Sequence, residues 1–387
     1  MTTIEVRNVS LDAPDGRRLL DDVSLSVPSG SRLAVCGPPG AGKTALMRVL
    51  VGLDEHTDGD VLIDGDLVNS ASPRQRDLAL VFSDYALHPH LDVYDNLAFA
   101  ARLRRGSNRN NLDDRVEEVA EFLALGHLLD DKPADLDDSQ RQRVAIGRAL
   151  VRDAAGYLFD EPFTAQDDRV RSHVRSVTTR WQTERNRTSI FTTSDVQEAL
   201  SLADRVAVMH QGYVHQVGSP RDLYDRPHDV FVASFLGSPS MNLVPARVSG
   251  GQLVLPFANI ALDESLRRRV GDRDWVIVGI RPELCYDANS PEGREINDRV
   301  DFTTLIDDVE WRPKTQLVYL GYELPEEVEE TLAEIEDILD FDLFQNFFVA
   351  ELSAGSDLRA GMTARIVVPR EGVHLFDAET GESLTHG

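Results

Sequence analysis

The sequence predicts an α/β domain followed by a smaller all-β domain with a barrel fold. Over roughly the first 235 residues, apolar runs typical of buried strands alternate with stretches whose apolar residues recur at helical spacing. A turn-forming Gly-Ser-Pro-Ser cluster at residues 237–240 ends this alternation. Beyond the cluster, short β-rich segments dominate, as they do in small barrels. We therefore expect one domain at residues 1–236 and a second at residues 237–387.

The first domain combines predicted strands with a helical part. Its strand candidates are the apolar runs at residues 32–36, 78–82, 157–159, 189–193 and 205–210. Residues 113–125 are predicted to form a helix, because their apolar members are spaced three and four apart: Val116, Val119, Ala120 and Leu123. This helix lies within residues 84–150, where we expect a helical subdomain.

The second domain is predicted from short strands and one acidic helical segment. The strand candidates are residues 246–248, 252–255, 276–280, 316–320 and 364–368. Between the last two, a strongly acidic stretch has apolar residues at helical spacing: Leu332, Ile335, Ile338 and Leu339. We therefore expect a helical insertion at about residues 322–345.

Charge and composition exclude several classes of protein. The 387 residues include 40 basic and 66 acidic ones, and the formal net charge of −26 argues against binding a nucleic-acid backbone. A hydrophobic content of 42% is enough to fill real cores and excludes wholesale disorder. No apolar run approaches the ~18 residues of a membrane helix. The first residues lack a signal-peptide pattern, so we expect the chain to stay in the cytosol.

The basic residues are almost all arginine, since the lysines are only Lys43, Lys132 and Lys314. An acidic, lysine-poor composition favours adaptation to high salt, where charge repulsion is screened. Calcium binding is the alternative, although the acids are spread along the chain and no DxDxDG loop ending in Glu occurs. Cys36 and Cys285 have no paired spacing, so neither a disulfide framework nor a thiolate metal site is supported, and Cys36 is expected in the core.

The sharpest motif is a phosphate-binding loop. Residues 37–44 read Gly-Pro-Pro-Gly-Ala-Gly-Lys-Thr, match G-x-x-x-x-G-K-[ST], and lie between a predicted strand and a helix beginning near Ala45. Glycines let backbone N–H groups point at phosphate oxygens, and the helix adds its positive N-terminal end. Lys43 is expected to reach the β- and γ-phosphates of a nucleoside triphosphate, and Thr44 to ligate Mg²⁺. The expected nucleotide-binding residues are Gly37, Pro38, Pro39, Gly40, Ala41, Gly42, Lys43, Thr44, Ala45 and Asp160.

A second motif, Gly-Tyr-Leu-Phe-Asp-Glu-Pro at residues 156–162, follows the phosphate loop along the chain. Its apolar strand is expected to deliver Asp160 to the Mg²⁺. Glu161 is then placed to orient or deprotonate the attacking water, and it is our candidate catalytic residue. Alone, an apolar run ending in Asp-Glu is explained equally well by a helix-capping acid after a strand. Together with the phosphate loop, it predicts a nucleotide-hydrolysing site.

Further segments extend this pattern along nearly the whole chain. Residues 81–90 read Val-Phe-Ser-Asp-Tyr-Ala-Leu-His-Pro-His, and residues 140–150 read Gln-Arg-Gln-Arg-Val-Ala-Ile-Gly-Arg-Ala-Leu. With residues 203–209, 216–220, 224–227, 237–242, 279–283 and 373–377, they resemble the ATP-binding subunits of ABC importers. More narrowly, the chain is similar to the sugar and glycerol-phosphate importer group that carries a C-terminal regulatory domain.

The resemblance implies a fold, cofactors and partners. The fold is a P-loop ABC ATPase domain with a helical subdomain, followed by an OB-like regulatory domain. The cofactors are ATP and Mg²⁺, and the function is to energise import of sugars or related small solutes. The partners are transmembrane permease subunits, a second ATP-binding subunit (a copy or a paralogue) and, indirectly, a solute-binding protein. The chain would act peripherally at the cytoplasmic face of the membrane, with residues 85–87 and neighbouring helices forming a docking groove.

Several positions depart from the family pattern. Ser83 stands where the family has its Q-loop glutamine, and Ser194 where it has the switch histidine. The signature Leu-Ser-Gly-Gly-Gln reads Leu-Asp-Asp-Ser-Gln at residues 136–140. Asp138 or Ser139 is a suitable N-cap for the following helix, yet Asp137 and Asp138 would bring carboxylates near the γ-phosphate of an opposing subunit. Losing one donor to a developing charge typically costs about 10²–10³ in rate, so the sequence predicts weakened hydrolysis.

Two further departures concern the D-loop and the adenine. Gln166 replaces the family's leucine, although Asp167 remains. Residues 11–18 contain no aromatic residue to stack on adenine, and the guanidinium of Arg17 or Arg18 is the available substitute.

Three functions remain open from the sequence. The chain is a working importer ATPase, a hydrolysis-poor subunit with a structural or regulatory task in an importer, or an ABC protein outside transport. The last is disfavoured, because such proteins usually have paired cassettes or coiled-coil arms, whereas this chain has one cassette and an importer-type barrel.

Overall fold

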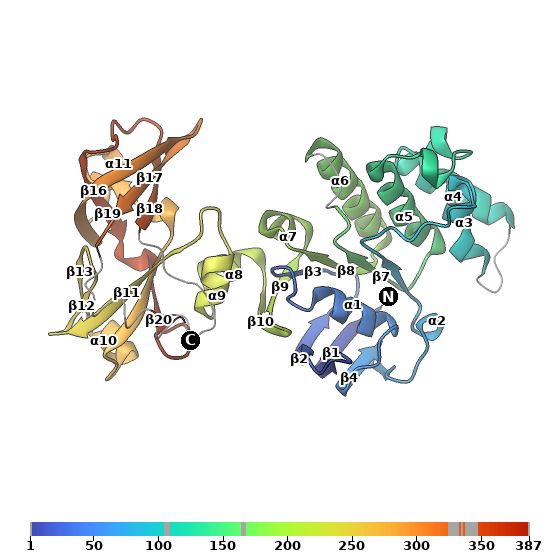
Figure 1. Ribbon diagram of the computed structural model, residues 1–387, viewed down its shortest axis with the longest axis horizontal. Helices are drawn as coiled ribbons and strands as arrows, with labels where there is room; N and C mark the ends of the chain where they lie inside the picture. Colours follow the sequence, from blue (N-terminus) through green and yellow to red (C-terminus); the bar gives the residue numbers. More distant parts are fainter. Residues whose placement is uncertain are drawn as a thin grey trace. The chain divides into compact units, whose positions relative to one another are not determined.

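The computed structural model describes residues 2–103, 109–163, 168–323 and 347–385, together with Ala333 and Glu336 (Figure 1). Gln166, Asp167 and most of the predicted insertion at residues 322–345 lie outside the described residues. The chain divides into two compact units, residues 1–220 and 221–387. The second unit therefore begins before the turn at residues 237–240.

The first unit starts with an antiparallel sheet in the order β2-β1-β4-β5. Its strands are β1 (Ile4–Asp12), β2 (Arg18–Val27), β4 (Asp58–Ile63) and β5 (Asp66–Leu67). Residues alternate between buried and exposed over positions 23–27 of β2, as in a sheet with one solvated face. These strands are not among those predicted from the sequence, because polar residues interrupt their apolar runs.

A six-stranded sheet forms the centre of the first unit, in the order β10-β9-β3-β8-β7-β6. All neighbouring pairs are parallel except β9 and β10. The strands are β3 (Arg32–Cys36), β6 (Leu78–Val81), β7 (Gly156–Asp160), β8 (Thr188–Thr193), β9 (Arg205–His210) and β10 (Tyr213–Gly218). The strands predicted at residues 32–36 and 205–210 have the expected bounds. Continuous apolar sequence predicted them because parallel strands are covered on both faces.

Helix α1 (Lys43–Val51) shares one apolar core with both sheets. Its Leu46 and Leu50 pack in the same cluster as Val6 of β1 and Val35 of β3. The helix starts at Lys43 rather than near Ala45. Cys36, at the end of β3, is buried as predicted, and burial raises the pKa of its thiol to about 12. The unit also contains α2 (Pro73–Arg76), α6 (Asp168–Arg185) and α7 (Val196–Leu202).

A group of helices follows β6 (Figure 1), and its apolar core also includes residues of β6, β7, β8 and α6. It contains α3 (Val93–Arg102), α4 (Arg109–Phe122), η1 (Gly126–Leu128), η2 (Pro133–Asp135) and α5 (Asp138–Arg152). Leu97 of α3 lies so close to Gly147 of α5 that an added Cβ there would be 2.6 Å from the leucine. Helix α4 ends at Phe122, not at residue 125 as predicted, because Ala124 has a φ of 52°, outside the helical region.

The second unit contains two five-stranded antiparallel sheets, in the orders β13-β12-β11-β14-β20 and β15-β19-β16-β17-β18. The first consists of β11 (Asn242–Ser249), β12 (Gln252–Val254), β13 (Asn259–Ala261), β14 (Trp275–Ile280) and β20 (Val373–Asp377). The other consists of β15 (Tyr286–Asp287), β16 (Arg299–Trp311), β17 (Thr315–Gly321), β18 (Phe347–Ser353) and β19 (Thr363–Pro369). Apolar residues of both sheets form one core, so the strands predicted beyond residue 240 belong to a single β unit.

The helices of the second unit whose bounds lie within the described residues are short. They are α8 (Pro220–Asp225), α9 (Val230–Phe235), α10 (Glu264–Val270), η3 (Pro282–Leu284), α11 (Pro291–Glu295) and η4 (Arg370–Gly372). Among the described residues, no helix combines the length and apolar character needed to cross a membrane.

Arg281 explains why the chain divides before residue 237. Its side chain is buried, and its guanidinium donates to the carbonyls of Tyr224 (2.9 Å), Ala233 (3.1 Å) and Leu236. It also lies over the Tyr224 ring, 3.9 Å from the ring centroid. Burial lowers the pKa of Arg281. Because Arg281 follows β14, it fixes α8 and α9 to the β unit.

Candidate functional site

The phosphate loop joins the end of β3 to the start of α1, and two of its glycines are required by close contacts. A Cβ at position 37 would lie 2.0 Å from the Met209 carbonyl oxygen. Gly42 has a φ of 99°, and a Cβ there would lie 2.6 Å from the Leu19 carbonyl oxygen. Any other residue at either position would displace the backbone. The loop therefore wraps as closely as the motif predicts.

Lys43 lies at the centre of the site and is almost completely buried. Its Nζ donates to the carbonyls of Gly37 (2.8 Å) and Pro38 (3.0 Å), and to the Ser194 hydroxyl (3.0 Å). It also lies 3.4 Å from Glu161 Oε1. An ammonium group has three protons, so each has an acceptor here. A phosphate oxygen would have to exchange with one or more of these acceptors.

Thr44 and Asp160 bring oxygen atoms together beside Lys43. The Thr44 hydroxyl lies 2.9 Å from Asp160 Oδ2, and the Thr192 hydroxyl donates to Asp160 Oδ1 at 2.7 Å. Asp160 is at the end of β7 and is buried. Hydroxyl and carboxylate oxygens are the ligands that Mg²⁺ prefers. The donor set therefore fits the metal that the sequence predicts there.

Glu161 is held in an unusual backbone conformation. Its φ is 45°, and its N–H donates to the Thr192 hydroxyl at 3.0 Å and to the Thr192 carbonyl at 3.2 Å. A positive φ is uncommon for a residue with a Cβ and is tolerated where the surroundings enforce it. The Glu161 carboxylate accepts a hydrogen bond from Ser194 Oγ at 2.8 Å. The fold thus directs Glu161 toward Lys43 and Ser194.

Ser194 contacts both charged groups of the site. Position 194 was expected to lack the family's switch histidine, and the structure shows that its serine hydroxyl lies between Lys43 and Glu161. Thr192, which contacts Asp160, was also missed. Strand β8 pairs with β7 and β3, so Thr192 lies opposite Asp160 and Thr193 opposite Cys36. The available signal was the rule that the carboxyl ends of neighbouring parallel strands form one edge.

Ser83 does not join this cluster by any hydrogen bond within the described part of the chain. Its side chain is exposed. The next residues turn back sharply, with φ values of 63° at Tyr85 and 44° at Ala86. Arg148 holds this turn, donating to the Ala86 carbonyl at 2.6 Å and the Tyr85 carbonyl at 3.1 Å. The segment is therefore fixed through its backbone.

The signature-like segment begins α5, and its N-cap is Asp137, not Asp138 or Ser139 as predicted. Asp137 Oδ1 accepts from the Gln140 N–H at 2.7 Å, and the Gln140 side chain accepts from the Asp137 N–H at 2.8 Å. This reciprocal pair is a capping box. Asp138 is free of that task and pairs with Arg141 at 2.9 Å, with 68% of its side chain exposed. The cap thus involves only one of the two acids.

Arg17 and Arg18 are paired with neighbouring acids. Arg17 lies 2.8 Å from Asp15, and Arg18 lies 3.2 Å from Asp12. Their predicted role in stacking on adenine stays a prediction.

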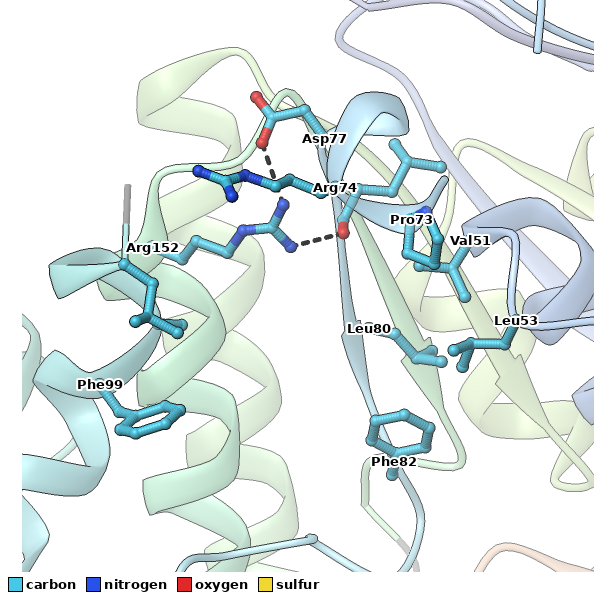
Figure 2. Close-up of a pocket in the computed structure, with 12 residues that line it drawn as sticks. Val51, Leu53, Pro73, Arg74, Asp77, Leu80, Phe82, Phe99 and Arg152 are labelled. Atoms are coloured by element: carbon cyan, nitrogen blue, oxygen red, sulfur yellow. Dashed lines mark hydrogen bonds and ion pairs between the residues drawn. The ribbon is translucent and has the colours of Figure 1, made fainter. Parts of the chain in front are cut away.

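An apolar groove of about 740 Å³ lies beside the helical group (Figure 2). Its wall includes Leu53, Leu80, Phe82, Phe99 and Leu103. Three of these are substantially exposed: Leu53 (45%), Phe99 (36%) and Leu103 (66%). At its rim, Asp77 and Arg152 form an ion pair of 3.1 Å. Residues 85–87 are not among those that line it.

Comparison with known proteins identifies both units. A family model described as "ABC transporter" matches residues 20–164, and one described as "MalK OB fold domain" matches residues 237–285. The chain is 36% identical to the trehalose import ATP-binding protein SugC of Mycobacterium tuberculosis, over 100% of this chain and 99% of that protein. It is 34% identical to the sn-glycerol-3-phosphate import ATP-binding protein UgpC of Psychromonas ingrahamii, over 99% and 96%.

Solved structures agree on the fold. The dimeric ATP-binding cassette MJ0796, in a post-hydrolysis state bound to ADP and Pi, matches with a TM-score of 0.53 and 25% identity. The match covers 56% of this chain and 99% of that cassette. The predicted fold class, a P-loop ABC ATPase followed by an OB-like domain, is thereby confirmed. The chain belongs to the family of ABC importer ATP-binding proteins and has a C-terminal OB domain of the MalK type.

Proposed function

We propose that this ATP-binding subunit binds Mg·ATP, hydrolyses it slowly, and energises import of a sugar or related small solute. The names of the relatives support the substrate class, since one imports trehalose and the other glycerol 3-phosphate. The observation that carries the proposal is the contact set around Lys43. The groups expected to bind phosphate and metal are assembled, while a short serine hydroxyl occupies the place between Lys43 and Glu161.

Each assembled residue has a distinct role in this proposal. Lys43 and the backbone N–H groups of residues 40–45 hold the triphosphate. Thr44 and Asp160 hold Mg²⁺, which when bound neutralises phosphate charge. Glu161 orients or deprotonates the attacking water. The strand edge supports these roles, because Thr192 positions both acids through one hydroxyl.

We expect slow hydrolysis because two serines are shorter than the family's γ-phosphate-contacting residues and two acids stand in the signature segment. Ser194 reaches Lys43 and Glu161 in this structure, but a hydroxyl has neither the length nor the positive charge of a histidine donor. Ser83 is exposed and has no contact with the cluster among the described hydrogen bonds. Asp137 and Asp138 would place negative charge near the γ-phosphate of an opposing subunit; at 4 Å, like charges repel by roughly 1–4 kcal/mol, depending on shielding. Arg141 offsets part of this through Asp138.

The partners follow from the apolar groove and from the family. We propose that a cytoplasmic segment of a transmembrane permease occupies the groove beside Phe82 and Phe99, which would hold the chain at the cytoplasmic face of the membrane. Exposed apolar side chains support this, because such patches mark interaction sites. A second ATP-binding subunit, either a copy or a paralogue, completes the composite sites, and a solute-binding protein delivers the solute. We further propose that residues 1–236 serve nucleotide binding and residues 237–387 regulation.

The deciding experiment restores the family residues and measures ATP turnover. The changes are Ser83→Gln, Ser194→His, Asp137→Ser, Asp138→Gly and Ser139→Gly, made together in the complex with permeases at high salt. Serine at 137 keeps a good N-cap, so the helix start is preserved. We expect turnover to rise about 10²–10³-fold.

The control carries the same changes plus Lys43→Ala and should have no turnover, which assigns any gain to this site. A parent rate already at about 1–10 per second, unaltered by restoration, would refute slow hydrolysis.

A second function is favoured by the two signature acids. Suppose that the partner is an intact paralogue. One composite site then lacks the family's glutamine and histidine, because Ser83 and Ser194 stand in their places. The other site faces Asp137 and Asp138. Neither site is complete, so the chain would act as a regulatory or structural subunit. ATP turnover that stays at background in the purified assembled complex would favour this function over the first.

A further inference from the structure

A second cavity in the ATP-binding unit lies at the amino ends of β7 and β8. It has a volume of about 350 Å³ and is lined by Trp181 and three arginines, Arg115, Arg185 and Arg187, with Glu118 and Asp153. Asp153 lies just before β7, and Arg187 comes directly before β8. The phosphate loop faces the opposite ends of these strands. From Gly156 to Asp160, β7 covers roughly 13 Å at about 3.3 Å per residue, so the two sites are separate.

The cavity wall contains buried donors that have no acceptor in the described part of the chain. Trp181 is 3% exposed, and its indole Nε1 has no hydrogen-bond partner there. The Nε of Arg187 is likewise buried without a partner. Behind the cavity wall, Tyr157 packs edge-on against Trp181, with ring centroids 5.4 Å apart. Proteins rarely leave buried N–H groups unpaired, so each such group calls for an explanation.

Charge and geometry indicate the kind of ligand. Three guanidinium groups face two carboxylates, which leaves the lining at net +1 in a chain of net −26. The carboxylates are already engaged, Glu118 with Arg185 at 2.6 Å and Asp153 with Arg187 at 2.5 Å. Arg115 donates to the Val151 carbonyl rather than to an acid. The cavity groups that still lack an acceptor are therefore N–H donors, the Trp181 indole and the Nε of Arg187. Planar guanidinium groups match the geometry of phosphate oxygens.

We propose that this cavity binds a small anion that carries a phosphate group. Trp181 supplies an indole N–H, and Arg115, Arg185 and Arg187 supply the positive charge. Arg185 also lies over the Trp181 ring, 4.8 Å from its centroid, so the anion would meet a cation already positioned by an aromatic ring. The ligand is either inorganic phosphate or a phosphate monoester, since both present the same oxygens.

Trp181 makes the site directly observable. The chain has three tryptophans, so Trp275→Phe with Trp311→Phe leaves Trp181 as the sole indole. Mg·AMP-PNP is kept saturating to block the phosphate loop, and KCl holds ionic strength constant. The titrants are inorganic phosphate, glycerol 3-phosphate and, as the uncharged control, glycerol. We expect a saturable change in Trp181 fluorescence with at least one phosphate compound and none with glycerol. The tighter titrant of the two distinguishes a free phosphate from a monoester.

Two arginines on the same helix provide a matched pair of variants. Arg185→Gln alters the cavity, whereas Arg180→Gln removes an exposed partner of Glu184 on α6 and leaves the cavity untouched. We expect Arg185→Gln to weaken phosphate binding about tenfold or more, since hydrogen bonds to charged groups are the strong ones, and Arg180→Gln to leave it unchanged. Trp181→Phe, followed by calorimetry, should weaken it similarly.

Equal binding by the parent and by Arg185→Gln would overturn the proposal, as would the absence of any saturable response. Chloride that competes as effectively as phosphate would also overturn it, because the cavity would then be a general anion site. Arg185 is at the surface, so this variant remains informative even if Trp181→Phe does not fold.

Discussion

The phosphate loop and the segment after β6 are held in place by different means. Lys43 is buried and gives each of its protons to an acceptor, whereas the Ser83 side chain is exposed. Arg148 fixes the second segment through the carbonyls of Tyr85 and Ala86, which every residue type possesses. A substitution in the loop therefore disturbs the fold, while one at position 83 changes only chemistry. This difference means that position 83 can change without disturbing the buried contacts of the phosphate loop.

The largest expected effect tests the catalytic side of this contrast. Glu161→Gln keeps the shape of the side chain and removes its basic oxygen. We expect residual ATP turnover in the assembled complex to fall by about 10²–10⁴, the usual contribution of a positioned acid or base. Glu184→Gln, at an exposed position of α6, is the control. Turnover that survives Glu161→Gln would mean that another group activates the water.

Lys43→Ala tests whether the buried phosphate loop binds ATP. The variant removes a cation whose hydrogen bonds to phosphate are charge-assisted, and two such bonds correspond to a loss of about 10² in ATP affinity. Calorimetric titration measures it. Lys132→Ala is the control, because Lys132 is exposed and its Nζ donates to the His90 carbonyl at 3.1 Å. ATP bound equally by parent and Lys43→Ala would refute the placement of the nucleotide.

Arg148→Met tests whether the segment after β6 is held independently of the nucleotide. The change removes two hydrogen bonds from a charged donor and should lower the free energy of unfolding by about 2 kcal/mol. ATP affinity should stay as it is. Arg221→Met, at a side chain that is 90% exposed, should change stability by less than about 0.5 kcal/mol. If ATP affinity fell together with stability, the two regions would not be independent.

The smallest expected effect concerns the N-cap of α5. Asp137→Ala should destabilise the chain by about 1 kcal/mol, and Asp137→Ser should restore most of that, since serine is also a good cap. Urea denaturation of the three proteins decides this. Equal stability of the alanine and serine variants would show that the cap contributes nothing.

The sequence predicted those parts of the site that are contiguous in the chain. The phosphate loop and the Asp160–Glu161 pair each lie within one short run, so local pattern was sufficient. Ser194 and Thr192 were missed as site residues because their proximity depends on β8 pairing with β7 and β3, a tertiary fact. The end of α4 at Phe122, before the positive φ of Ala124, was missed for another reason. Alanine favours helices, and only the packing around it imposes a φ of 52°.

The cap of α5 shows the limit of residue preferences. Asp137, Asp138 and Ser139 are all good capping residues, so preference alone could not choose among them. Gln140 makes Asp137 the N-cap, because it lies three residues later and forms both hydrogen bonds of the capping box with Asp137. The antiparallel sheet of β1, β2 and β4 escaped notice because its half-solvated strands mix apolar and polar residues.

The contacts of buried Arg281 determine where a chimera of this protein can be joined. A chimera joined at residue 236 would take α8 and α9 from one parent and the guanidinium from another, so the placement of the carbonyls around the buried arginine would depend on helices from a different protein. A junction after Pro220 keeps donor and acceptors on one fragment. The segment that keeps these contacts together is thus longer than the OB fold, because it includes the connecting helices α8 and α9.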